Sequence, residues 1–203
     1  MTKVKICGLM ETEHVEAAVE AGVDAVGFVF APSRRRVAIA QAKELARSVP
    51  EHVLKIGVFV NATAEELAFA YREVPLDVVQ YHGEESAEFI QRVGLPSIKV
   101  VAVRGADDVM DVREAKTDFV LVDAPGIEFK GGSGKVFDWS LLKGELPKER
   151  MIVAGGLHAG NVRDAIRQVR PFMVDVSSGV EKDGRKDASL IREFIREVKE
   201  EES

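Results

Sequence analysis

The sequence predicts an α/β protein, a single-domain (β/α)8 TIM barrel that takes up residues 1–203. Short runs rich in Val, Ile and Phe alternate with longer amphipathic stretches, a pattern that implies parallel strands joined by crossover helices. Eight such units fit into the 203 residues, which matches the lower end of the size range of barrels. A doubly wound open sheet has the same periodicity and is the alternative, but the count of eight and the lack of a linker favour the barrel.

The strand candidates are apolar runs of four to seven residues. They span Lys3–Cys7, Ala25–Phe30, Leu54–Val60, Val78–His82, Ser97–Val103, Phe119–Asp123, Met151–Ala154 and Phe172–Val176.

Helices are predicted between these runs, because apolar residues there recur at a spacing that places them on one helical face. Such stripes are Val15, Ala18 and Val19; Leu67, Ala70, Tyr71 and Val74; Val162, Ala165, Ile166 and Val169; and Leu190, Phe194 and Val198. Thr63 followed by Glu66 is typical of a capping box, and Gly22 and Gly94 are typical of helix ends.

The composition excludes several classes of protein. Hydrophobic residues make up 46% of the chain and charged residues 31%, so it can bury a core without disulfide or metal staples. A net charge of -6 disfavours nucleic acid as a partner, and no apolar run is long enough to cross a membrane. Met1 leads almost directly into the first strand, which leaves no room for a signal peptide, and a single cysteine makes neither an internal disulfide nor a zinc site. We therefore expect a cytoplasmic location.

Two reactive side chains end predicted strands, where barrels build their active sites. Cys7 closes the first strand and Asp123 the sixth, and a glycine or a glycine-rich loop follows each. A thiol and a carboxyl at these places predict an acid/base pair over one cavity. Alternatively, Cys7 is a small buried core residue and Asp123 caps a loop through its own hydrogen bonds.

Further polar residues follow other strands. His82 and Gln80 share one face of their strand, and His82 is either structural or a substrate contact. Asp175 either contacts the substrate or orients a neighbour. Of the run Arg34–Arg36, at least one arginine facing the mouth is suited to grip a carboxylate with two hydrogen bonds. No metal-ligand spacing is recognisable, and we expect neither a metal nor a cofactor.

The last two loops of the barrel resemble a phosphate site. Gly155 and Gly156 follow the seventh strand and precede a predicted helix, and Ser178 and Gly179 follow the eighth. Glycines let the backbone approach an anion closely, and N–H groups at a helix start point toward it. Barrels often bind phosphate at these two loops.

The segment Gly131–Lys135 has the look of a nucleotide-binding loop but fails its pattern. That pattern requires glycine where Phe129 stands and serine or threonine where Val136 stands. A lid beside Asp123 is the preferred interpretation, and an ordinary surface loop is the alternative.

The run Val4-Lys5-Ile6-Cys7-Gly8-Leu9 resembles the opening of the phosphoribosylanthranilate isomerases of tryptophan biosynthesis. The resemblance continues in order along nearly the whole chain, through Val79-Gln80-Tyr81-His82-Gly83-Glu84-Glu85 and Leu121-Val122-Asp123 to Asp175-Val176-Ser177-Ser178-Gly179-Val180-Glu181. The chain departs from the family at Met10, Tyr81 and Ala124, where threonine, leucine and a hydroxyl residue are more usual.

This resemblance implies an Amadori rearrangement of N-(5-phosphoribosyl)anthranilate to an open-chain deoxyribulose phosphate, with Asp123 as general acid and Cys7 as general base. It places the substrate phosphate against Gly155, Gly156, Ser178 and Gly179, and it suggests Arg36 for the anthranilate carboxylate. An acid must hold its proton, so we expect a raised pKa at Asp123; for Cys7 we expect a pKa that is lowered or at least not raised. The partner is then a phosphosugar, and both a monomer and a homodimer suit the fold.

Other functions make different demands. The histidine-pathway isomerase performs the same rearrangement on another aminoaldose and resembles two half-barrels with aspartates on strands one and five. Here the first strand offers Cys7, and Ser97–Val103 has no carboxylate. An enzyme with both substrates stays open. A barrel that only senses a phosphate ligand has no need of an acid/base pair.

Overall fold

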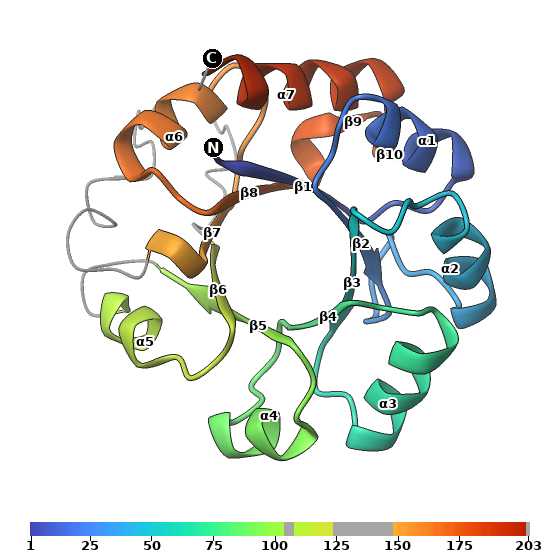
Figure 1. Cartoon of the computed structure of the whole chain (residues 1–203), viewed down its shortest axis with the longest axis vertical. Helices are drawn as coiled ribbons and strands as arrows, with labels where there is room; N and C mark the ends of the chain where they lie inside the picture. Colours follow the sequence, from blue (N-terminus) through green and yellow to red (C-terminus); the bar gives the residue numbers. More distant parts are fainter. Residues whose placement is uncertain (104–107, 124–147, 202–203) are drawn as a thin grey trace.

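The structure of the chain is a computed structural model that describes residues 1–103, 108–123 and 148–201. Within these residues, eight parallel strands close into a barrel in chain order, and β8 pairs with β1 to complete the ring. Figure 1 looks down this ring, with the helices arranged around its outside. The predicted (β/α)8 barrel is therefore confirmed.

Each barrel strand begins and ends within one residue of its predicted range. The strands are β1 (Lys3–Cys7), β2 (Ala25–Val29), β3 (Leu54–Phe59), β4 (Val78–Tyr81), β5 (Ser97–Ala102), β6 (Phe119–Asp123), β7 (Met151–Ala154) and β8 (Met173–Val176). Valine and isoleucine dominate these runs, and such β-branched side chains suit a sheet that is buried on both faces.

Helices separate most of the strands. They are α1 (Thr12–Glu20), α2 (Ile39–Ala46), α3 (Ala64–Glu73), α4 (Ala87–Val93), α5 (Val109–Glu114), α6 (Val162–Val169) and α7 (Ala188–Glu201), with short 3-10 turns η2 (Lys148–Arg150) and η3 (Ser178–Val180). A small antiparallel pair, β9 (Glu181–Lys182) and β10 (Arg185–Lys186), lies between β8 and α7. The segment Gly131–Lys135 and Ala124 lie outside the described residues.

The predicted helix signals act as expected. The Thr63 side chain accepts a hydrogen bond from the Glu66 N–H while the Glu66 carboxylate accepts one from the Thr63 N–H, which completes the capping box of α3. Gly94 ends α4 with a φ of 69°, and Gly22 follows α1 with a φ of 85°. Both angles fall in the left-handed region that glycine adopts without strain.

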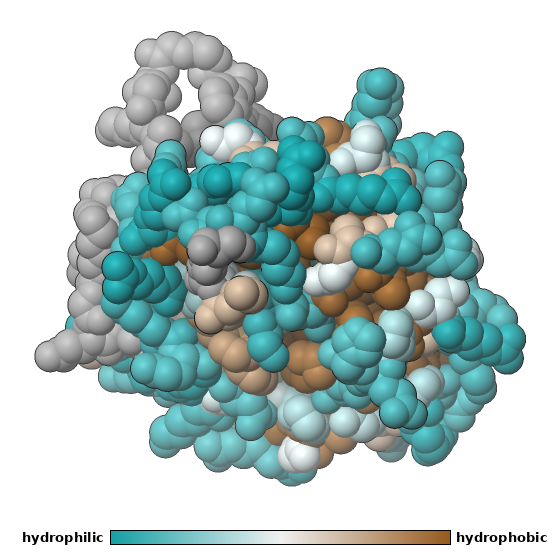
Figure 2. Space-filling view, turned by 45° about the horizontal axis from the view of Figure 1, so that its top comes forward, coloured by the Kyte–Doolittle hydropathy of each residue, from teal (hydrophilic) through white to brown (hydrophobic). Residues whose placement is uncertain are grey.

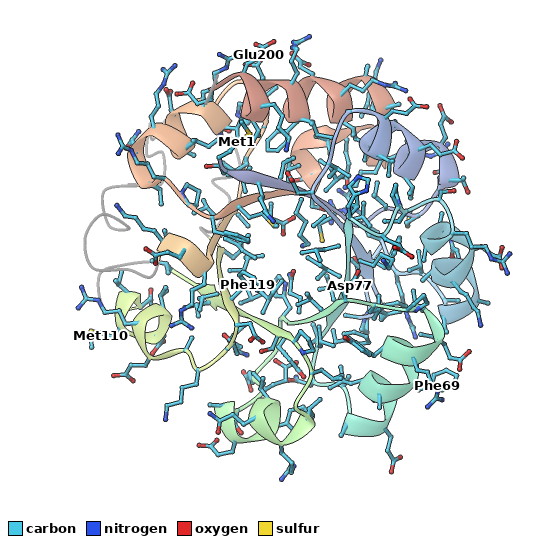
Figure 3. All side chains as sticks on the ribbon, viewed as in Figure 1. Met1, Phe69, Asp77, Met110, Phe119 and Glu200 are labelled. Carbon is cyan, nitrogen blue, oxygen red and sulfur yellow. The ribbon has the colours of Figure 1, made fainter. Side chains whose placement is uncertain are left out.

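The core has two parts, one on each side of the strand ring. The larger part packs the outward side chains of the strands against the helices. The smaller part fills the barrel interior and comprises Ala25, Ile56, Val78, Ile98, Leu121, Ile152, Ala154 and Met173. Figure 3 shows side chains filling the ring, whereas Phe69, Met110 and Glu200 lie on the outside. The interior is thus closed by packing, and space for a ligand is left at the ends of the strands.

The same kind of hydrogen bond recurs three times at the amino-terminal rim of the barrel. Asp24, Asp77 and Asp118 each stand directly before an even-numbered strand. Their carboxylates accept hydrogen bonds from backbone N–H groups of the preceding odd-numbered strands, at 2.9 Å from Val4, 2.7 Å from Lys55 and 2.8 Å from Ser97. Each bond fixes how far one strand is offset from the next.

The surface carries many ion pairs. Between α6 and α7, the Arg163 guanidinium binds Glu197 at 2.5 Å and Glu200 at 2.7 Å, and Arg167 binds Glu201 at 2.6 Å. Figure 2, which turns the α7 side of the molecule forward, shows a mostly hydrophilic face with apolar residues in the hollows between polar ones. None of the described helices is long and apolar enough to span a membrane.

Candidate active site

A cavity of about 420 Å³ opens at the carboxyl ends of the strands. It brings together most of the predicted site residues, namely Cys7, His82, Asp123, Gly155, Gly156, Asp175 and Ser178. Arg36 and Gly179 are not among its lining residues. A larger hollow of about 820 Å³ lies beside Thr2, Pro171 and Phe172 at the opposite rim, and none of the predicted site residues lines it.

Cys7 reaches the cavity because its neighbour on β2 has no side chain. Cys7 pairs with Gly27 in the sheet. A Cβ atom built on Gly27 would lie 2.9 Å from the Cys7 Sγ atom and 3.1 Å from its Cα atom. Real side chains are not packed this closely, so glycine at this position is what leaves room for the sulfur.

A polar network lies in the barrel beneath the cavity. The Lys5 ammonium donates hydrogen bonds of 2.9 Å to Gln80 Oε1 and 2.9 Å to Asp175 Oδ2, and Lys5 is fully buried. Burial is the largest single effect and disfavours the ammonium form, but the contributions of Asp175 and Cys7 together outweigh it, so the pKa of Lys5 is raised. Asp175 lines the cavity, and its Oδ1 atom is buried and has no partner among the described residues.

The expectation for the Cys7 thiol is wrong. Burial raises its pKa, and the nearby Lys5 and Lys186 ammonium groups reverse only part of that effect. The residue is 8% exposed, so the thiolate loses most of its hydration. A thiolate with a raised pKa is present in smaller amount but is a stronger base.

The expectation for Asp123 holds. Burial raises the pKa of this carboxyl, the neighbouring His82 lowers it in part, and Asp175 raises it further. His82 Nε2 lies 3.8 Å from Asp123 Oδ2, and both side chains remain partly exposed, His82 at 43% and Asp123 at 35%. The carboxyl is therefore suited to keep a proton while it stays within reach of a ligand.

The loops after β7 and β8 meet closely. Gly155 and Gly156 have φ angles of 93° and 63°. A Cβ atom on Gly179 would lie 1.8 Å from the Leu157 carbonyl oxygen, so only glycine permits this contact. Gly179 thus lies behind the cavity wall, where it holds the two loops together, while Ser178 lines the cavity itself. The helix after the glycine pair begins only at Val162.

The arginine that faces the cavity is Arg35, and it is already paired. Its guanidinium donates to both carboxylate oxygens of Glu181, at 2.6 Å and 3.0 Å. Arg34 and Lys186 bind the same carboxylate at 2.6 Å and 2.9 Å. Burial opposes the charge of Glu181, but the bonds from Arg35 and Lys186 outweigh it and lower the pKa of Glu181. Three cations on one carboxylate leave an excess of positive charge beside Ser177 and Ser178.

Arg36 lies in a neighbouring groove of about 370 Å³. The groove is otherwise mostly apolar, with Phe30, Phe59 and Val60 in its walls, and it shares Val60 with the cavity. Apolar walls with one cation suit an aromatic carboxylate.

Sequence reasoning missed the contributions of Lys5, Glu181 and Lys186. Lys5 was recognisable only as a residue on the same strand face as Cys7. Glu181 and Lys186 belong to the hairpin of β9 and β10, which the turn residues Asp183-Gly184 signal in the sequence. Nothing local in the sequence shows that the Glu181 side chain binds Arg35, 146 positions away, or that Lys186 binds the same carboxylate.

The fold and the cavity together define an acid/base enzyme built on a (β/α)8 barrel. A family model described as N-(5'phosphoribosyl)anthranilate (PRA) isomerase matches residues 4–197, and the chain belongs to this family. A curated relative from Bacillus cereus, named N-(5'-phosphoribosyl)anthranilate isomerase, is 47% identical over 201 residues, 98% of each chain.

Solved structures agree. The chain is similar to the phosphoribosyl anthranilate isomerase of Thermotoga maritima, with a TM-score of 0.87, 42% identity, and coverage of 98% of this chain and 100% of that one. Another phosphoribosyl anthranilate isomerase, in complex with reduced 1-(o-carboxyphenylamino)-1-deoxyribulose 5-phosphate, matches with a TM-score of 0.84 at 39% identity, again over 98% and 100% of the two chains.

Proposed function

We propose that the protein converts N-(5'-phosphoribosyl)anthranilate to 1-(2-carboxyphenylamino)-1-deoxyribulose 5-phosphate, an isomerisation in tryptophan biosynthesis. The single observation that carries this proposal is the meeting of Cys7 and Asp123, from β1 and β6, in one cavity of a chain that belongs to this enzyme family. The reaction moves protons and breaks one carbon–oxygen bond. A base and an acid suffice for it.

Asp123 serves as the general acid. It donates its proton to the furanose ring oxygen, the bond from that oxygen to C1′ breaks, and the nitrogen lone pair forms an iminium ion. The raised pKa of Asp123 keeps a proton available for this step. His82, 3.8 Å away, is placed to orient the carboxyl or to contact the sugar.

Cys7 serves as the general base. Its thiolate removes the proton from C2′ of the iminium ion, the electron pair of that C–H bond neutralises the iminium nitrogen, and an enolamine results. The enolamine then tautomerises to the ketone. A positioned acid or base typically contributes about 10²–10⁴ in rate.

The substrate is held by groups around the pair. Gly155, Gly156, Ser178 and Gly179 form the two loops that we assign to the phosphate, and the excess positive charge around Glu181 favours an anion there. The unpartnered Asp175 Oδ1 accepts a sugar hydroxyl. Arg36, in its groove beside the cavity, pairs with the anthranilate carboxylate.

The location follows from the base. A reactive thiol must stay reduced, and cytoplasm keeps thiols reduced. We therefore place the enzyme in the cytoplasm.

The test is the decay of anthranilate-type fluorescence when purified protein meets freshly generated N-(5'-phosphoribosyl)anthranilate. Wild type should accelerate the decay, and Cys7→Ala and Asp123→Asn should each lower kcat by about 10² or more. Asp164→Asn is the matched control, because this exposed carboxylate of α6 lies outside the cavity. Folded wild-type protein without turnover would reject the function, and an active Cys7→Ala would reject the base.

A further inference from the structure

Lys5 is a buried cation in the barrel interior. It is among the largest fully buried side chains of the described residues, and an ammonium group placed there needs partners to remain charged. Asp175 and Gln80 supply two, each at 2.9 Å. Because the pKa of Lys5 is raised, the ammonium group keeps its charge at neutral pH.

The Lys5 side chain runs beside the Cys7 sulfur. The two residues are two positions apart on β1 and therefore share one face of the strand. A Cβ atom on Gly27 would lie 2.9 Å from Cys7 Sγ and 3.3 Å from Lys5 Cε, so the sulfur and the lysine stem pack over the same glycine. No side chain of β2 separates them at this position.

The ammonium has bonding capacity to spare. It carries three N–H donors, and two of them serve Gln80 and Asp175. The charge of the Lys5 ammonium favours the thiolate form of Cys7. A donor beneath the sulfur stabilises the charge that a base must carry before it accepts a proton.

Other titratable or charged groups also surround the thiol. Among the described residues they are Asp175 on β8, Lys186 on β10, Arg35 and Glu181 at the rim, and His82 and Asp123 across the cavity. Lys186 is shared with Glu181, to which it donates at 2.9 Å. Lys5 exceeds both Asp175 and Lys186 in its electrostatic effect on Cys7.

We propose that Lys5 is a positioning residue of the isomerase, whose buried ammonium group increases the fraction of Cys7 present as the thiolate that takes the C2′ proton. Lys5 keeps its own proton throughout, and only the thiolate and the C–H bond change. The inference rests on the proposed function for its place in the reaction, but its electrostatic part concerns the free protein.

Cys7 is the only cysteine in the chain, so any thiol signal reports this residue alone. We would titrate the ultraviolet absorbance of the thiolate, and the rate of alkylation by iodoacetamide, against pH in the absence of substrate. Lys5→Met should leave about tenfold less thiolate at a given pH. The acidic limb of the kcat/KM profile should therefore move to higher pH by about one unit. Lys55→Met is the matched control, because Lys55 is another buried lysine with an aspartate partner, Asp77 at 3.0 Å, and lies outside the cavity.

Gln80→Glu is the second variant, in case Lys5→Met fails to fold. It keeps the lysine but adds a negative charge to the same network, and it should also move the thiol titration upward. An unchanged titration in the folded variants, or an equal shift in Lys55→Met, would overturn the proposal. If the titration moves while wild type lacks isomerase turnover, the proposed function falls and the thiolate effect stands.

Discussion

The cavity holds its base and its acid in different ways. Cys7 sits on the β1–β8 side, is nearly buried, and packs over Gly27 above the closed network of Lys5 and Asp175. Asp123 on β6 is about one-third exposed, and among the described residues its side chain is paired only with the similarly open His82, at 3.8 Å. The position of the Cys7 side chain is thus fixed by tight packing, whereas the pKa of Asp123 is raised by partial burial. Substitutions that change side-chain volume should therefore affect the surroundings of Cys7 most, and substitutions that change charge should affect those of Asp123 most.

The largest effect should come from adding one methyl group beside the base. Gly27→Ala places a Cβ atom 3.1 Å from the Cys7 Cα atom, a backbone contact that cannot swing away. We expect a loss of about 1–3 kcal/mol in the free energy of unfolding, and about 10²-fold in kcat from displacement of the thiol. Denaturant unfolding and the fluorescence assay measure the two losses.

The matched change on the acid side is Ala154→Gly, since Ala154 pairs with Asp123 as Gly27 pairs with Cys7. Removing this methyl should cost only about 0.5–1 kcal/mol. Equal losses of stability in Gly27→Ala and Ala154→Gly would show that Cys7 is not packed more tightly than Asp123.

A smaller effect concerns pH on the acid side. Because the folded pKa of Asp123 is raised, the folded state binds this proton more tightly than the unfolded state does. Its stabilising contribution is complete below the ordinary range near 3.8 and is lost as pH rises through the folded pKa. Asp123→Asn should therefore raise stability at neutral pH, by less than about 1 kcal/mol given its exposure, even though it removes the acid that turnover needs.

Unfolding curves of wild type and Asp123→Asn across the acid range provide the measurement. The advantage of the variant should vanish at low pH. Cys7→Ala should show no comparable gain at neutral pH, because the raised pKa leaves that thiol mostly protonated there. A gain for Asp123→Asn that persists at low pH would point to packing instead of charge.

The smallest effect should come from a buried oxygen that faces neither side of the cavity. The Tyr81 hydroxyl has no partner among the described residues, and burial raises its pKa to about 12. Asp175 Oδ1 is likewise buried and unpartnered, but it belongs to a residue that lines the cavity. Tyr81→Phe should keep full activity and change the free energy of unfolding by no more than about 1 kcal/mol, toward greater stability. A clear loss of activity would mean that this hydroxyl acts on the site.

The sequence was sufficient to predict the barrel and the central pair. Strand periodicity located all eight barrel strands, and the rule that active sites gather at strand ends brought Cys7 and Asp123 together. The turn from Ser33 to Arg36 was less predictable. Its hydrogen bond from the Arg36 N–H to the Ser33 carbonyl, at 3.1 Å, belongs to an aperiodic loop, so which arginine faces the cavity could not be read from spacing.

The ionisation of Cys7 was harder still. A general base must lose its proton, so this role predicted a Cys7 pKa that is lowered or at least not raised. The structure buries the sulfur, which raises its pKa; Asp175 on β8 raises the pKa further, while Lys5 on β1 and Lys186 on β10 lower it. Only the closed barrel, with its strands in register, brings these three elements to one atom.

The three aspartates at the amino-terminal rim bear on the cavity at the other end. Side chains alternate between the two faces of a strand, so a slip of one residue would turn every inward group toward the helices. Asp24, Asp77 and Asp118 each hold one pair of strands against such a slip. Three carboxylates at the rim opposite the cavity therefore help to set which side chains face the cavity.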